Sequence, residues 1–384
     1  MKASSGCSVS RAVGTVIMSA VGVGLNFIPQ VLGSCGLLGG SIVLLCGSAL
    51  TIFSTYLVQE TVKLTKDSEC ETSFKAIAKL LYGDLVSKLT DGLLKVTLLA
   101  ILSLLLSLMG TRLKSVFRSQ VDWRVFVPVS AFACLPFIFL RKIRYVGLMS
   151  LAGVFLIFGF VCVVVTKATL DAVYELSEPS DVLYFTKAAT ASQKISIYFA
   201  SLSTTFFSTF MVTAIPPVLQ QMTFPSDFYL VNYFGNGSVL VINLLMSIPC
   251  YLAYGSAIDR GVLDVLSAGQ CSPLVTVAEV FMLLACVPKY VTVFVCLAPD
   301  ATCGRILVFF STAVLSLVMP RLDLIVGLIG SISAVYLSVF VPVAFYFRAK
   351  RRNHLKLTKR EIVSLTLLTL AGFAIAVFGI SVSI

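Results

Sequence analysis

Long apolar runs that contain no charged residue constrain this chain more than any other feature of its sequence. The runs at 39–58 and 147–165 are each about 20 residues long, the length that a helix needs to cross a hydrocarbon core of about 30 Å. Charged residues make up 12% of the 384 residues, against about 25% in soluble domains, and the mean hydropathy is +0.99. A water-soluble fold cannot bury this much apolar surface, so the sequence predicts an integral membrane protein.

Hydropathy divides the chain into about eleven such segments, and each is a candidate membrane-spanning helix. Backbone polar groups in lipid need partners within the segment or in a closed barrel, and these segments lack the alternating pattern of barrel strands. We therefore expect an all-α polytopic protein that forms one membrane domain over residues 1–384. The expected spans are 11–32, 37–59, 93–111, 124–140, 145–166, 192–216, 230–255, 273–298, 303–320, 322–347 and 361–383.

The basic residues flank these apolar segments and predict their orientation. The two strongest clusters, 141–144 and 348–360, both fall on the cytosolic side when the N-terminus is cytosolic, which places the C-terminus on the opposite side. The connection at 112–124, with four basic residues on the outer side, is an exception. The net charge of +11 thus indicates topology and contact with lipid head groups rather than nucleic-acid binding. The cluster at 348–360 could also bind phosphoinositides.

Two polar stretches, 60–92 and 168–191, separate some of the spans. The first contains the segment 73–89, whose apolar residues share one helical face, so we expect an amphipathic helix along the cytosolic membrane surface. The second is rich in acids and could shape an entrance on the outer side or serve only as a solvated linker. Cys35 and Cys271 would share that side, and whether they pair stays open.

The first span contains a candidate break at 19–29, where Gly22 and Gly24 permit unusual backbone angles before Pro29. A broken helix exposes amide groups that suit a carboxylate and carbonyl groups that suit an ammonium or a small cation. One piece of backbone could thus bind both ends of an amino acid. The alternative is that the glycines merely allow helices to pack closely.

The sixth span also combines helix-breaking residues with many hydroxyl groups. Corresponding interruptions in two halves of a chain are typical of inverted-repeat transporters, here with repeats at 11–166 and 192–347 and a final helix at 361–383. The hydroxyls could instead satisfy carbonyl groups of their own helix. They belong to Ser201, Ser203, Thr204, Thr205, Ser208, Thr209 and Thr213.

Four short segments occur in an order that covers nearly the whole chain. Residues 22–29 read GVGLNFIP, 207–222 begin with an aromatic residue and end with a proline and a methionine, 250–255 read CYLAYG, and 330–342 begin GSI and end with proline. They resemble motifs in helices one, six, seven and ten of the amino acid/auxin permease family, within the superfamily that shares the leucine-transporter fold.

This resemblance implies a fold of about eleven helices with a 5+5 inverted repeat, amino-acid substrates and coupling to protons or sodium. Asn26 and Thr209 depart from the family pattern, in which an apolar and an aromatic residue are usual at these positions, so the substrate preference can differ. The expected substrate-binding residues are Ser19, Gly22, Val23, Gly24, Phe207, Ser208 and Thr209.

Ionisable residues within the spans are rare, and Lys289 in the eighth span stands out. An ammonium in hydrocarbon costs from about 2.5 kcal/mol upward, so it faces a cavity or a partner. Lys289 could replace a bound sodium ion, carry a proton, or only snorkel toward the cytosolic side. In sodium-coupled relatives a hydroxyl on helix eight helps to bind the ion, which by resemblance corresponds to Thr292, whereas Met18 stands at the position of the polar partner on helix one.

These features together predict a secondary active transporter of neutral or cationic amino acids, coupled to protons or working as an exchanger. The alternative is a membrane nutrient sensor that binds amino acids without net transport. We expect no cofactor or metal beyond the coupling ion and no nucleic-acid partner. No acid pair, metal-ligand cluster or nucleophile with its base suggests an enzyme, and no repeated filter sequence suggests a channel. The expected location is the plasma membrane or a vacuolar or lysosomal membrane, and the oligomeric state stays open.

Overall fold

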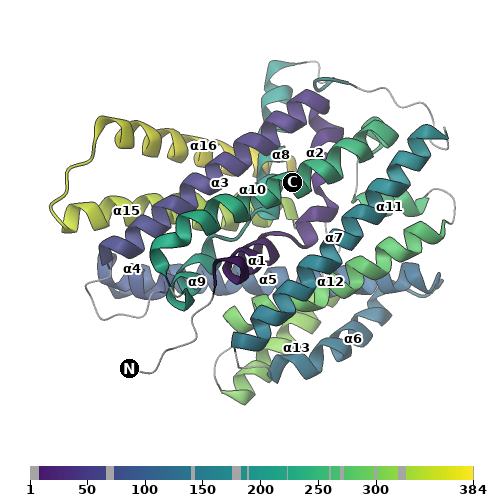
Figure 1. Cartoon of the computed structure of the whole chain (residues 1–384), viewed down its shortest axis with the longest axis horizontal. Coiled ribbons are helices and arrows are strands. Elements are labelled where there is room, and N and C mark those ends of the chain that lie inside the picture. The colour runs from purple at the N-terminus through teal and green to yellow at the C-terminus, as the bar shows by residue number, and fades with distance from the viewer. Residues whose placement is uncertain are drawn as a thin grey trace.

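The computed structural model describes residues 8–65, 73–139, 143–174, 183–187, 190–222, 224–258, 261–268, 272–297, 301–318 and 326–383, and the structural statements below concern these residues. They form a bundle of helices (Figure 1). Seven helices are long and apolar enough to cross a membrane, or eight if one bent pair counts as a span, and two shorter apolar helices accompany them. The predicted all-α polytopic fold is confirmed.

The first half of the chain forms helices at the first five expected spans. They are the broken pair α1 (Val9–Ala20) and α2 (Ile28–Cys35), α3 (Leu37–Thr65), α5 (Asp84–Val116), α6 (Trp123–Cys134) with its extension η2 (Leu135–Phe139), and α7 (Ile143–Val173). The short helix α4 (Phe74–Tyr82) lies between α3 and α5.

The second half begins with another broken pair. Its elements are α8 (Ala191–Ser208) and α9 (Ile215–Gln221), α10 (Phe228–Tyr254), the short α11 (Val262–Ala268), α12 (Pro273–Leu297), α13 (Thr302–Val318), a helix over 326–352 that contains the π-helical stretches η6 (Ile329–Ala334) and η7 (Tyr336–Phe340) and ends as α15 (Val341–Arg352), and finally α16 (Lys359–Ser383). Figure 1 shows α15 and α16 as a helical pair at one end of the molecule.

Local sequence explains where several helices begin and end. The Thr190 hydroxyl accepts from the backbone of Gln193 at 3.4 Å, and the Gln193 side chain accepts in return from the Thr190 backbone, so a capping box starts α8. Ser73 caps α4 by accepting from the Ala76 amide at 3.1 Å. Gly83 ends α4 with φ +88°, a conformation that glycine adopts easily.

The predicted amphipathic helix at 73–89 is therefore divided, because the part after Gly83 is the start of α5. The apolar face of α4 is buried, and the Phe74 ring lies 6.1 Å from that of Phe345 in α15. In the acidic stretch at 168–191, Asp171 lies within α7, while its residues 175–182 lie outside the described residues. Cys271 and the basic Arg141 and Lys142 are also outside them, so the Cys35–Cys271 question stays open.

The main apolar core runs through the middle of the bundle. Helix α12 packs along α7 and α5, and α10 packs along α1 and α3. The large side chains Tyr290 and Phe294 of α12 are fully buried, with ring centroids 5.9 Å apart. Met18 and Phe207, which lie close to the two helix breaks, belong to the same buried cluster. The breaks are thus inside the packed core.

Candidate functional site

The first broken helix opens where the two-glycine segment predicted it. Helix α1 ends at Ala20, and Val21 is extended (φ −74°, ψ 135°) before the single turn η1 (Val23–Asn26). The axes on the two sides of this break differ by 60°. The amide of Val21 still donates to the Ile17 carbonyl at 2.8 Å, so Ile17 is the last of the helical acceptors at this end. The next carbonyls of α1 are left without helical donors, as at any helix end.

The second broken helix opens after α8. Thr209 leaves the helix (φ −102°, ψ 14°), and the chain passes through the short turn η3 (Val212–Ala214) before α9 begins at Ile215. Pro216 at the start of α9 lacks an amide hydrogen, which suits the first turn of a helix and prevents α8 from continuing through it. Both interruptions predicted from the sequence are confirmed.

The two breaks meet at Gly24. A Cβ atom added there would lie 2.5 Å from the Cα atom and 2.8 Å from the Cβ atom of Ser208. Only glycine allows the backbones of η1 and the end of α8 to approach this closely. Beside this contact, the Thr209 hydroxyl lies 3.1 Å from the Thr51 hydroxyl of α3 and donates to the Thr205 carbonyl at 2.9 Å.

Lys289 reaches the end of α1 from α12. Its Nζ donates to the Met18 carbonyl at 2.9 Å and also to the Ser19 carbonyl, so the ammonium occupies the carbonyl groups that the break sets free. The side chain is 5% exposed, and a Cβ atom on Gly22 would lie 3.0 Å from its Cε. Because the carbonyl end of a helix carries partial negative charge, it favours a cation at this position.

Thr292 lies on α12 one turn after Lys289. Its hydroxyl donates to the Pro288 carbonyl at 2.8 Å and lies 3.4 Å from the Ser150 hydroxyl of α7. The sequence singled out Lys289 and Thr292 separately, and the helical spacing of three residues places them on neighbouring positions of one face. Ser150 is the neighbour that sequence reasoning did not assign to the site.

The hydroxyl groups near the breaks divide into two classes. Those of Ser19 and Thr205 donate to carbonyls of their own helices, at 2.7 Å to Thr15 and 2.9 Å to Ser201, as the alternative interpretation of the sequence expected. Ser203 instead reaches another helix, with its hydroxyl 2.8 Å from that of Ser331 and 3.0 Å from the Gly327 carbonyl, to which it donates.

The remaining expected substrate residues lie at the same breaks. Phe207 and Ser208 are buried in the last turn of α8, and Gly22 and Gly24 flank Val23 at the start of η1. The side chain of Val23 lies outside the described part of the structure. The structure thus brings together, around one region, residues that are far apart in the chain.

The short helix α11 covers the η1 side of the break. The amide of Leu263 donates to the Asn26 side-chain oxygen at 3.2 Å, and the Arg112 guanidinium of α5 pairs with the Asp264 carboxylate at 2.5 Å. The Arg112 side chain is only 4% exposed, so the arginine end of this ion pair is shielded from solvent. Asn26, which departs from the family pattern, therefore holds α11 against η1.

Comparisons with known proteins agree with this geometry. A family model described as transmembrane amino acid transporter protein matches residues 5–298 and 301–384. Among solved structures, the chain is similar to MhsT in complex with L-phenylalanine, at 16% sequence identity and a TM-score of 0.64, over 96% of this chain and 97% of that one. At this identity the likeness concerns the fold. No curated protein sequence matches the chain.

Proposed function

The chain belongs to the family of transmembrane amino acid transporter proteins, and from that premise we propose that it carries amino acids across the membrane by alternating access around the breaks in α1–α2 and α8–α9. The close approach of Gly24 to Ser208 is the observation that carries this proposal. It joins two interrupted helices inside the core, where broken backbone is tolerated only if it is buried in protein or lines a cavity.

Backbone groups at the breaks suit the two charged ends of an amino acid. The first amides of η1 have no acceptors within that turn and suit the substrate carboxylate, and the last carbonyls of α8 suit its ammonium. Phe207 and Thr209 would then lie beside the substrate side chain. The solved structure of MhsT holds L-phenylalanine, and we extend the expectation here to neutral and cationic amino acids.

The decisive experiment measures uptake of a panel of radiolabelled neutral and cationic amino acids by the purified chain in liposomes. We expect at least one amino acid to accumulate, or to exchange for unlabelled amino acid inside, at a rate well above that of protein-free liposomes. Binding of an amino acid without either uptake or exchange would instead support the sensor interpretation. No binding and no uptake across the panel would refute an amino-acid substrate.

We further propose that Lys289 takes the place of a coupling cation, so that transport does not need sodium. Two carbonyls at the end of α1, which could otherwise hold a small cation, already accept from its ammonium. If the ammonium releases its proton during the cycle, uptake is coupled to the proton gradient. If it keeps the proton, the group acts as a fixed charge and the protein works as an exchanger.

Uptake in liposomes with imposed gradients distinguishes these cases. Replacing external sodium by choline should leave uptake unchanged, and an inward proton gradient should accelerate it in the proton-coupled case only. Uptake that follows the sodium gradient and ignores the proton gradient would contradict the assignment of Lys289.

We also propose an orientation and a membrane for the chain. We place the N-terminus in the cytosol and the C-terminus on the opposite side, because the basic cluster at 348–360 then faces the cytosol. The location is the plasma membrane or a vacuolar or lysosomal membrane. Labelling of introduced terminal tags in intact and permeabilised cells tests the orientation.

A further inference from the structure

The connection between α15 and α16 carries an unusual concentration of exposed positive charge. It lies at one end of the molecule, where the two helices form a pair (Figure 1). Five basic side chains are exposed within ten residues, and they belong to Arg351, Arg352, Lys356, Lys359 and Arg360. We call residues 351–360 the basic hairpin.

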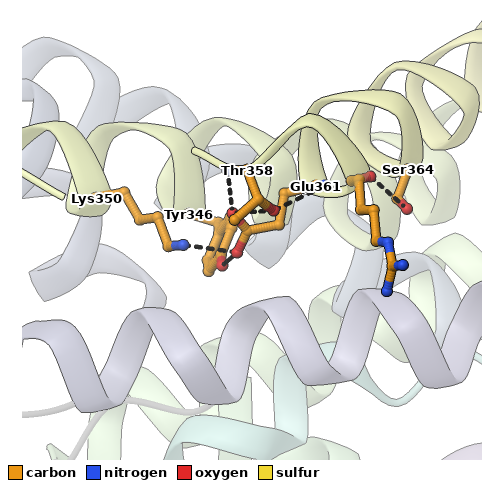
Figure 2. Close-up of polar contacts among 6 residues, drawn as sticks. Tyr346, Lys350, Thr358, Glu361 and Ser364 are labelled. Atoms are coloured by element: carbon orange, nitrogen blue, oxygen red, sulfur yellow. Dashed lines mark hydrogen bonds and ion pairs between the residues drawn. The ribbon is translucent and has the colours of Figure 1, made fainter. Parts of the chain in front are cut away.

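Glu361 directly follows the basic hairpin, and both of its carboxylate oxygens already accept hydrogen bonds from other residues. Its Oε1 accepts from the Tyr346 hydroxyl and from Lys350 Nζ, each at 2.6 Å, and its Oε2 accepts from the Thr358 amide at 2.8 Å and its hydroxyl at 3.0 Å (Figure 2). Residues 348–360 contain no acid of their own. The contacts of Glu361 fix the corner between the helices and engage Tyr346, Lys350 and Thr358 rather than the exposed cations.

Arg352 of the hairpin and Arg348 just before it hold the hairpin against α4. Arg348 and Arg352 donate to the carbonyls of Leu81 and Leu80, both at 3.2 Å, and so cap the C-terminal end of that helix. Arg348 also lies over the Tyr82 ring at 5.9 Å. These contacts place the hairpin rigidly at the end of the bundle.

Basic residues of the adjacent elements behave differently. Lys63, Lys75 and Lys79 pair with Glu60, Asp91 and Asp84. Within the described residues no ion pair reaches Arg351, Lys356, Lys359 or Arg360. The hairpin therefore gathers four exposed cations without an ion pair, within the described residues, into ten positions of the chain.

Exposed apolar side chains accompany this charge. Leu355 is 48% exposed in the connection, and Ile362 and Val363 are 49% and 57% exposed at the start of α16. Cations next to exposed aliphatic groups are typical of segments that lie at the boundary between head groups and acyl chains. If the cluster served only to orient the membrane helices by its positive charge, its residues would not need to stay free of ion pairs.

We propose that the basic hairpin binds lipids with multiply phosphorylated head groups, such as phosphatidylinositol bisphosphate, in the cytosolic leaflet. The charge comes from the four cations that have no ion pair within the described part of the chain, and Leu355 reaches the acyl region. The inference rests on the orientation proposed above, and it adds a lipid-binding site that is separate from the helix breaks.

Native mass spectrometry of the purified chain in detergent tests the site directly. The ligands are phosphatidylinositol bisphosphate, phosphatidylserine, phosphatidylcholine and free inositol trisphosphate. The hairpin variant combines Lys356→Gln, Lys359→Gln and Arg360→Gln. The matched control combines Lys63→Gln, Lys75→Gln and Lys79→Gln, which removes the same charge from ion-paired lysines.

Each basic residue near an anionic surface contributes about fivefold to affinity, so the hairpin variant should bind the bisphosphate lipid about 100-fold more weakly. The control should lose less than about threefold. Equal losses in the two variants would overturn the proposal, as would equally tight binding of phosphatidylserine or of free inositol trisphosphate. Because binding is measured without transport, its failure leaves the proposed amino-acid transport untouched, and a thermal melt of each variant checks that it folds.

Discussion

Replacing Gly24 by alanine tests whether the two helix breaks work as one unit. The added Cβ would lie 2.5 Å from the Ser208 Cα, whereas ordinary contacts begin at 3.4 Å, so η1 and the end of α8 must separate by about 1 Å. The Ser208 Cα is a backbone atom and cannot swing away as a side chain could. Displacing the groups of a functional site by about 1 Å can lower its turnover rate about 100-fold. We therefore expect the initial rate of uptake to fall about 100-fold.

A glycine series provides the controls. At Gly22 the nearest atoms belong to the flexible Lys289 side chain, at 3.0–3.3 Å, so Gly22→Ala should lower uptake by about tenfold or less. At Gly237 in α10 nothing lies within 4 Å of the added atom, so Gly237→Ala should leave uptake within about twofold. Ser208→Gly should not rescue Gly24→Ala, because the Ser208 Cα remains in the way.

Initial rates of radiolabelled uptake into liposomes, normalised to reconstituted protein, measure this series. Binding of the same amino acid in detergent shows whether affinity falls together with rate. If Gly24→Ala transports as fast as Gly237→Ala, the close approach of the two breaks is not needed for function, and the reasoning from Gly24 and Ser208 fails.

Three further perturbations test other parts of the structure. Lys289→Met removes the donor to the Met18 and Ser19 carbonyls, so in the proton-coupled case the acceleration of uptake by an inward proton gradient should disappear; if the wild type is accelerated and the variant is accelerated equally, Lys289 has no role in proton coupling. Asp264→Asn should lower the free energy of unfolding by about 1–2 kcal/mol, because Arg112 keeps a hydrogen-bond partner but loses its counter-charge. An unchanged melting temperature would argue against the ion pair. Glu361→Gln should lower stability by a similar amount, about 1–2 kcal/mol, without changing the KM for uptake, because its contacts fix the α15–α16 corner away from the breaks. A changed KM in Glu361→Gln would show that the corner reaches the substrate site.

Much of the candidate site was visible in the sequence because helix-breaking residues act locally. Gly22, Gly24 and Pro216 restrict or release their own backbone whatever surrounds them, so the positions of both breaks could be predicted. Hydroxyl-bearing residues were less informative. Ser19 and Ser203 look alike in sequence, yet Ser19 bonds within its own helix and Ser203 reaches a neighbouring helix. Which of the two occurs depends on how the helices pack.

The sequence by itself determined that this chain is a bundle of membrane helices interrupted twice, because apolar length and missing backbone donors are properties of single segments. Only the tertiary structure decided which groups meet. It placed Lys289 on the free carbonyls of α1, 270 residues away from Ser19 in the chain, and Gly24 against Ser208. Such contacts depend on how helices cross and rotate, which hydropathy does not encode because many rotations bury the same apolar area.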